Sequence, residues 1–220
     1  MTDFHSHILP GLDDGSKNVE ESVKILKMMA EQGIDRVAAT PHFYAAHSGE
    51  SPDEFLVRRN AAEQLLRERL KDEQGLPEIF CGAEVKYFRG MSGVEDLRKL
   101  TLQGTDLLLV EMPFEKWSDK VIKEVLSLSE NLDVIPVLAH IERFFSYQKN
   151  LDWIYDFKKE GILMQMNAEY ILGTFSHLMP LLHRGDNLPS HFLFLLAQNS
   201  HATVLSFQTV RSLILRHRFS

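Results

Sequence analysis

Short apolar segments of strand length alternate along this chain with segments whose apolar residues follow helical spacing. The strand-like segments are apolar on both faces, as in the run from Leu107 to Val110. Strands that bury both faces are typical of parallel sheets covered by helices. Six or seven such units favour a barrel over an open sheet, although alternation alone does not establish closure. The strands are expected at residues 1–7, 35–40, 78–83, 105–110, 134–139, 162–166 and 192–197.

Helices are expected between these strands. Ser16 has the residue type of an N-cap for the first helix, and Gly33 is suited to end it. Pro52 and Asp53 are expected to open a long charged helix that runs to about Glu73. Two further helices are expected at 118–130 and 151–159.

Composition narrows the class of protein. The 220 residues suit a single domain, 1–220. The net charge of −7, with no basic block, argues against a nucleic-acid-binding protein. A lone cysteine, Cys81, excludes an internal disulfide. With no signal peptide and no apolar run long enough to span a bilayer, the sequence predicts a cytoplasmic protein without membrane insertion.

Nearly every expected strand is followed by a residue that can bind a metal ion. In parallel α/β barrels the chemistry collects at these carboxyl ends of the strands. An acid or imidazole left unpaired directly after an apolar run would be costly, and shared cations would satisfy several at once. The candidates are His5, His7, His42, Glu84, Glu111 and His140, then Gln165 and Asn167, and finally Asn199 and His201.

Each candidate also has an ordinary interpretation. A histidine of this kind can be a hydrogen-bonded structural residue, and a carboxylate can cap a helix or form an ion pair. His5 and His7, two residues apart in a strand, point to the same side and can bind one cation. A mixed histidine and carboxylate site suits Mn, Fe or Zn, and bridging carboxylates allow more than one ion. Such a site activates water and neutralises phosphoryl oxygens, which indicates a phosphoester hydrolase.

Two further positions have two interpretations each. Asp13 and Asp14 either form a turn before the first helix or add a carboxylate ligand from the first loop. Arg143 either clamps phosphate oxygens or forms a surface ion pair with Glu142. The neighbouring candidate ligands favour the phosphate clamp.

Taken together, these segments resemble the bacterial capsule-type protein-tyrosine phosphatases of the polymerase-and-histidinol-phosphatase (PHP) superfamily. The resemblance covers about residues 1 to 172, with the motifs in the family's order and spacing. The opening segment and the Ala-His-Ile-Glu-Arg segment are the most specific to this branch. The segments are Asp3-Phe4-His5-Ser6-His7-Ile8-Leu9-Pro10-Gly11-Leu12-Asp13-Asp14-Gly15, Thr40-Pro41-His42, Gly82-Ala83-Glu84, Leu109-Val110-Glu111-Met112 and Ala139-His140-Ile141-Glu142-Arg143.

The resemblance implies a distorted (β/α)7 TIM-like barrel of the PHP type with two to three metal ions, often manganese. It implies hydrolysis of phosphotyrosine on an autophosphorylated tyrosine kinase that controls polysaccharide polymerisation and export. The expected substrate is the phosphorylated kinase tail or a phosphotyrosine peptide. Arg143 would bind the phosphate, and Arg143 and His42 are the expected catalytic residues. By motif, two metals would be held by His5, His7, Glu84, Glu111 and His140, and a third by Asp14 and His42.

The last part of the chain departs from the family. The usual late Ser-Asp-x-His and Arg-Pro-Pro segments are missing, and the nearest candidate is Ala197-Gln198-Asn199-Ser200-His201. His201 would fall on the family histidine, and Asn199, a neutral and weaker ligand, on its aspartate. Asn199 and His201 also fit an ordinary polar loop. We hypothesise that the tail from about residue 175 is divergent or reflects a shifted reading frame.

Two other functions remain open at this point. One is a small-molecule phosphomonoesterase, such as an enzyme acting on histidinol phosphate. The other, suggested by the altered tail, is a catalytically weakened metal-binding protein that regulates a kinase by docking on it.

Overall fold

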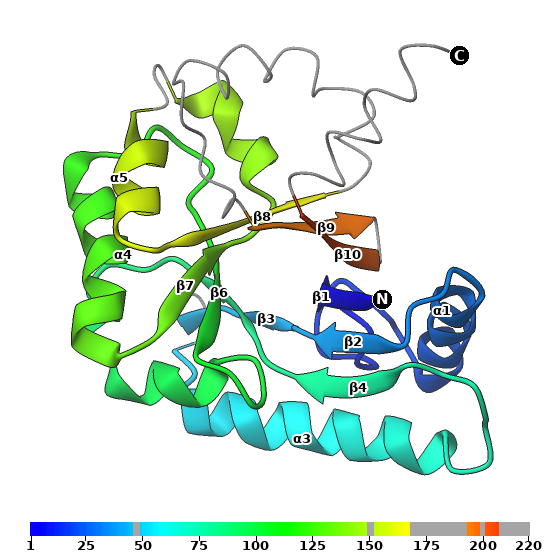
Figure 1. The fold of residues 1–220 in the computed structure, drawn as a ribbon. Coiled ribbons are helices and arrows are strands. Elements are labelled where there is room, and N and C mark those ends of the chain that lie inside the picture. The colour runs from blue at the N-terminus through cyan, green and yellow to red at the C-terminus, as the bar shows by residue number, and fades with distance from the viewer. Residues whose placement is uncertain (46–48, 149–151, 168–192, 199–200, 207–220) are drawn as a thin grey trace, which may run out of the picture.

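The chain folds into helices and mostly parallel strands (Figure 1). This computed structural model describes residues 1–220 except 46–48, 149–151, 168–192, 199–200 and 207–220. One sheet has the order β1-β2-β4, and the other β10-β9-β8-β7-β6-β5-β3. All pairs are parallel except β9 with β10. The strands are β1 (Thr2–Ser6), β2 (Arg36–Ala39), β3 (His42–Phe43), β4 (Glu78–Cys81), β5 (Glu84–Lys86), β6 (Leu107–Glu111), β7 (Ile135–Leu138), β8 (Leu163–Asn167), β9 (Leu193–Gln198) and β10 (His201–Ser206).

The mixed α/β class with parallel sheets is confirmed, and each expected strand is present. The expected closed barrel is not found: in the described part of the chain, strand pairing produces two sheets. The two are linked, because backbone hydrogen bonds continue across the breaks between β2 and β3 and between β4 and β5. The amide of Thr40 donates to the Ser6 carbonyl at 2.8 Å, and that of Glu84 donates to the Pro41 carbonyl at 3.0 Å.

These breaks position two residues of the site. Pro41 lies between β2 and β3, directly after the expected strand at 35–40. Gly82 lies between β4 and β5, where a Cβ would lie 2.5 Å from Leu102 Cδ2. After each break the chain resumes as a short strand in the second sheet. His42 and Glu84 are the first residues of β3 and β5 and face each other as paired residues of that ladder.

The helices cover the outer faces of the sheets. Figure 1 shows α3 running along β2 and β4, with α4 and α5 against β6 and β7. Ser51 and Glu54 form a capping box that fixes the start of α3. The helices are α1 (Val19–Glu31), α3 (Pro52–Arg69), α4 (Asp119–Leu132) and α5 (Trp153–Lys159), with 3₁₀ segments η1 (Met91–Gly93), η2 (Glu95–Leu100) and η3 (Ile141–Tyr147).

The expected cap of the first helix is wrong by two residues. Asn18 is the N-cap, and its side-chain oxygen accepts a hydrogen bond from the Glu21 amide at 3.0 Å. Ser16 is buried in the preceding loop, where its hydroxyl donates to the Asn18 carbonyl and contacts the Ser22 hydroxyl. A buried hydroxyl needs such partners, so Ser16 serves the loop instead of the helix.

Both faces of the strands are buried, as the apolar runs predict. On β6, Leu108 and Val110 pack towards the helices, whereas Leu109 joins a separate cluster with Val137 and Ala139 of the β7 region. Phe4 of β1 packs against this cluster and also against a second one, which contains side chains of β2 and β4. The strands therefore share an inner apolar layer distinct from the layer under the helices.

In the described ranges, no helix is both long enough and apolar enough to cross a bilayer.

Candidate metal centre

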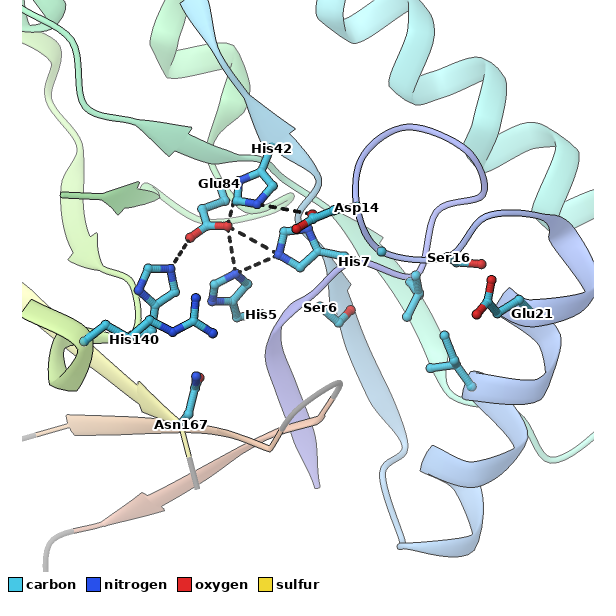
Figure 2. Close-up of a pocket in the computed structure, with 14 residues that line it drawn as sticks. His5, Ser6, His7, Asp14, Ser16, Glu21, His42, Glu84, His140 and Asn167 are labelled. Atoms are coloured by element: carbon cyan, nitrogen blue, oxygen red, sulfur yellow. Dashed lines mark hydrogen bonds and ion pairs between the residues drawn. The ribbon is translucent and has the colours of Figure 1, made fainter. Parts of the chain in front are cut away.

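Six candidate ligands meet at or just beyond the carboxyl ends of β1, β2, β4, β6 and β7. Five of them line a pocket of about 400 Å³, which Figure 2 shows in close-up. The sixth, Glu111, is the last residue of β6 and lies beside it. This convergence follows from the parallel topology, since all these strands end on one side. The six are His5, His7, His42, Glu84, Glu111 and His140.

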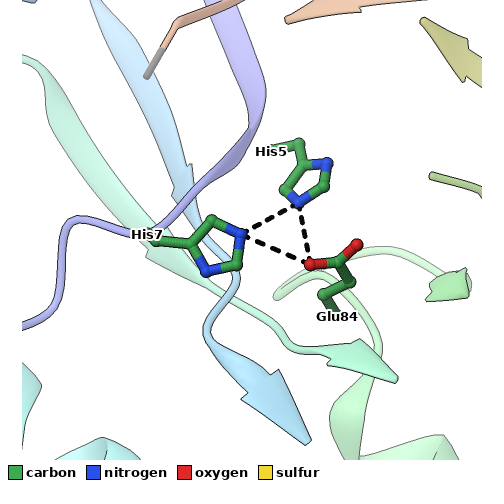
Figure 3. A group of neighbouring side chains, drawn as sticks. All are labelled: His5, His7 and Glu84. Atoms are coloured by element: carbon green, nitrogen blue, oxygen red, sulfur yellow. Dashed lines mark hydrogen bonds and ion pairs between the residues drawn. The ribbon is translucent and has the colours of Figure 1, made fainter. Parts of the chain in front are cut away.

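The carboxylate of Glu84 lies at the centre of the histidines. Its Oε2 atom is 3.2 Å from His5 Nε2, 3.3 Å from His7 Nε2 and 3.0 Å from His42 Nδ1. Its other oxygen, Oε1, is 2.8 Å from His140 Nε2. Figure 3 shows one group of possible ligands, in which His5, His7 and Glu84 point towards one another.

Four atoms of the candidate ligands are buried without a hydrogen-bond partner among the described residues: His42 Nδ1, Glu84 Oε2, Glu111 Oε2 and His140 Nδ1. Glu84 Oε2 lies close to three ring nitrogens, yet it accepts no well-formed hydrogen bond from any residue that the structure describes. His140 Nδ1 is likewise buried without such a partner among the described residues. Buried polar groups normally have partners, and exceptions call for an explanation. A cation bound between these groups would satisfy Glu84.

The cluster stabilises positive charge. Although burial alone would raise it, the pKa of Glu84 is held well below its usual value by the charge of His5 and the hydrogen bond from His140. Burial alone would lower the pKa of His7, but Asp13 and Glu84 outweigh it and raise this pKa to about 10. A divalent cation at the same place would receive the same stabilisation.

Burial shifts the protonation of the remaining candidate ligands. Burial lowers the pKa of both His42 and His140, which favours the neutral imidazole that binds metals. Burial and the neighbouring charge of Glu84 raise the pKa of Glu111. Two carboxylates this close, sharing the same histidine, resist ionising together unless a cation neutralises them.

Neighbouring residues fix the orientation of two histidines. His5 Nδ1 lies 3.0 Å from Gln165 Oε1, and His7 Nδ1 lies 2.7 Å from Asp13 Oδ2. Both partners are acceptors, so in the neutral rings the Nδ1 atoms donate and the Nε2 lone pairs face the pocket. Metal-binding histidines are usually oriented by such contacts.

Gln165 connects three parts of the site. Its Oε1 atom accepts a 2.6 Å hydrogen bond from the His140 amide, and its Nε2 donates to Asn167 Oδ1 at 3.0 Å. His140 has φ of +31°, a left-handed conformation that is strained for a residue with a side chain. The hydrogen bond from the His140 amide to Gln165 supports this conformation, which points the imidazole ring at Glu84. Gln165, a possible ligand by sequence, therefore lies where it orients two other ligands.

The loop after β1 separates the roles of two adjacent aspartates. The side chain of Asp13 is only 4% exposed, and besides contacting His7 it accepts hydrogen bonds from the amides of His42 (2.9 Å) and Gly15 (3.0 Å). Asp14 is 83% exposed, with Oδ1 3.5 Å from His42 Nε2. Gly15 is required because a Cβ there would lie 2.3 Å from His7 Cβ and from the His7 carbonyl oxygen. Sequence reasoning did not find the orienting role of Asp13.

The donor set fits more than one ion. Three groups of residues each place ligand atoms within 4.8 Å of one another. Imidazole nitrogens and carboxylate oxygens in this mixture suit Mn, Fe or Zn. The groups are His5, His7 and Glu84; His7, Asp14 and His42; and His42, Glu84 and Glu111.

Arg143 lies in the same pocket with its side chain available. It follows His140 on the first turn of η3 and is exposed. The alternative expected partner, Glu142, instead accepts from the Asn167 amide. The guanidinium of Arg143 makes no ion pair or hydrogen bond with any residue in the described ranges, so its donors are free for a bound anion.

The two late candidates are not placed at the site. Asn199 lies outside the described residues. His201 is the first residue of β10, where its backbone pairs with Gln198, and its side chain is not described.

Replacing Asp13 with alanine should weaken metal binding by about 10- to 100-fold, because His7 loses the contact that orients it. Titration of the metal-free chain with Mn²⁺, followed by calorimetry, measures this affinity. Asp72→Ala, at an exposed aspartate in the turn after α3, is the matched control and should leave it unchanged. Equal affinities for Asp13→Ala and the wild-type chain would contradict the orienting role.

Comparison with known proteins agrees with this geometry. The family model described as "Capsular polysaccharide synthesis, CpsB/CapC" matches residues 1–203. The tyrosine-protein phosphatase YwqE of Bacillus subtilis (strain 168) is 31% identical over 181 residues, which cover 80% of this chain and 67% of YwqE. The tyrosine-protein phosphatase CpsB of Streptococcus agalactiae serotype III (strain NEM316) is 29% identical over 175 residues, or 78% of this chain and 69% of CpsB.

A solved structure agrees as well. It comes from work on YwqE of Bacillus subtilis and CpsB of Streptococcus pneumoniae, described there as unique metal-dependent tyrosine phosphatases. It matches this chain with a TM-score of 0.72 and 26% identity, over 99% of this chain and 87% of its own. The family match covers most of the chain, and its range includes every residue that lines the pocket just described. The chain therefore belongs to the CpsB/CapC family of capsular polysaccharide synthesis proteins.

Proposed function

We propose that this chain is a metal-dependent tyrosine phosphatase acting on a bacterial tyrosine kinase that controls capsular or exopolysaccharide synthesis. The observation that carries the proposal is the buried Glu84 carboxylate, surrounded by four histidines. Arg143 lies in the same pocket and has no ion-pair partner among the residues that the structure describes. The names of the relatives support the same activity. The substrate would be a phosphorylated kinase tail or another phosphotyrosine peptide, met in the cytoplasm.

The centre would hold two to three ions, with manganese preferred and iron or zinc also suited to the donors. When bound, such ions lower the pKa of water and neutralise phosphoryl oxygens. Asp14 and His42 would hold the third ion. The assignment of His201 and Asn199 as further metal ligands stays a prediction. The first two ions would be held by His5, His7, Glu84, Glu111 and His140.

Arg143 would bind the phosphate, and it is suited to do so because its guanidinium can contact two phosphoryl oxygens at once. His42 is the second catalytic residue that we propose, since it lines the pocket between Asp14 and Glu84. The leaving group makes modest demands, because the phenol of tyrosine has a pKa of about 10. Holding the phosphate in place is therefore the main task of these side chains.

We further propose one catalytic domain over residues 1–220, arranged as a distorted seven-unit TIM-like barrel with an atypical tail from about residue 175. Two observations support the barrel. The inner apolar layer is shared by β1, β2, β4, β6 and β7, and β9 and β10 lie beside β1.

Two other functions are less well supported. A small-molecule phosphomonoesterase of the histidinol-phosphatase kind is not favoured by the relatives, which are named tyrosine-protein phosphatases. A catalytically weakened regulatory protein would need a defective centre, and the six main candidate ligands all converge in the structure.

The purified chain supplied with Mn²⁺ should hydrolyse a phosphotyrosine peptide, and removal of the metal by EDTA should reduce the rate to background. Release of inorganic phosphate measures both, with histidinol phosphate as the competing substrate. Turnover of histidinol phosphate without turnover of the peptide would contradict the tyrosine phosphatase. Full metal loading without turnover of either substrate would indicate the weakened regulatory protein instead.

Arg143→Ala should lower kcat/KM for the peptide on the order of 100-fold, because transition-state charge on the phosphoryl oxygens loses its fixed donors. Metal content should stay at the wild-type level. Arg143→Lys should recover only part of the rate, since lysine cannot form the two-pronged contact. The control is Arg36→Ala, which removes an exposed arginine of β2 paired with Glu78. Wild-type rates in Arg143→Ala would refute the assignment.

A further inference from the structure

Three residues lie shortly after candidate ligands, at or beyond the ends of three adjacent strands. Tyr44 follows His42 by two residues, and Lys86 follows Glu84 by two. Phe114 follows Glu111 by three. Because β3, β5 and β6 are neighbours in the second sheet, the three residues occupy consecutive positions along one edge of the metal centre. We call Tyr44, Lys86 and Phe114 the aromatic rim.

Lys86 is held between the two rings. Its Nζ atom lies 5.4 Å from the ring centroid of Tyr44 and 5.7 Å from that of Phe114. The same atom is 3.3 Å from Glu111 Oε2, so the ammonium group is tethered to the metal centre. A cation within about 6 Å of a ring face is attracted to it. The rim therefore combines two aromatic surfaces with a fixed positive charge.

Both rings lie against candidate ligands. The ring of Tyr44 stacks on His42 with centroids 4.8 Å apart and planes 23° apart. The ring of Phe114 stacks on His140 at 6.2 Å and 18°. Phe114 also packs on buried Phe144, at 4.9 Å, yet it remains 41% exposed. A large apolar side chain exposed beside a polar pocket is a feature of ligand sites.

We propose that the aromatic rim binds the phenyl ring of the substrate and so selects aryl phosphates over alkyl phosphates. This inference rests on the proposed phosphatase function. The first group of a phosphate ester bound at the metal centre would extend towards the rim, which contacts His42, Glu111 and His140. An arene there can stack on Tyr44 or Phe114 and place its π-face near Lys86. An alkyl ester has no ring to make these contacts.

Two non-hydrolysable ligands with the same head group test this. Phenylphosphonate carries the ring and methylphosphonate does not, and calorimetry on the Mn²⁺-loaded chain measures the affinity for each. The wild-type chain should bind phenylphosphonate more tightly than methylphosphonate. Phe114→Leu and Tyr44→Leu should each lower the affinity for phenylphosphonate about 5- to 10-fold. The affinity for methylphosphonate should stay within about twofold of the wild-type value. Tyr155→Leu, at an exposed aromatic residue of α5, should change neither.

The charge is tested separately. Lys86→Met should reduce the preference for phenylphosphonate, and Lys86→Arg, which keeps a cation over the rings, should retain it. Metal content and the unfolding midpoint are measured for every variant. If the ring variants lose affinity for both phosphonates equally, the rings only support His42 and His140, and the proposal fails.

Equal binding of both phosphonates by the wild-type chain would also overturn the rim proposal, while leaving the phosphatase function standing. If the wild-type chain binds neither, the proposed function itself is contradicted, and the rim proposal with it.

Discussion

The site depends on one unfavourable element, the buried and ionised carboxylate of Glu84. An isolated carboxylate in a protein interior would be neutralised or unstable, so its surroundings must compensate for the charge. Here the compensation comes from four imidazoles on β1, the loop after it, β3 and the turn after β7. Each of these elements must bring its histidine level with the start of β5. The breaks at Pro41 and Gly82 achieve this by bringing His42 and Glu84 into one ladder.

A second layer of contacts holds the imidazoles in place. Asp13 contacts the imidazole of His7 and accepts a hydrogen bond from the backbone amide of His42, so one carboxylate aligns two ligands. Gln165 does the same for His5 and His140. The close approach at Gly15 lets the first loop fold tightly over His7. Because these contacts hold the ligand atoms in place beforehand, less free energy is needed to organise them when ions bind.

The sequence was informative where a local rule decides the outcome. Apolar runs identify the parallel strands, and a histidine or acid directly after such a run marks the edge where the side chains meet, which is why Glu111 and His140 could be found. Rules of this kind do not separate Asp13 from Asp14, since their roles depend on how the loop folds over β1. Nor do they place Gln165 beside His5, a contact between residues 160 positions apart. The N-cap of α1 is Asn18 and not the expected Ser16, because Ser16 is buried in that loop.

Anomalous diffraction from crystals of the chain grown with Mn²⁺ tests the central claim most directly, because it places ions without assuming any role for the side chains. The account predicts two or three anomalous peaks, with Glu84 in contact with at least one and His5 or His7 coordinating the same ion. Fully loaded crystals whose peaks all lie away from Glu84 would contradict it.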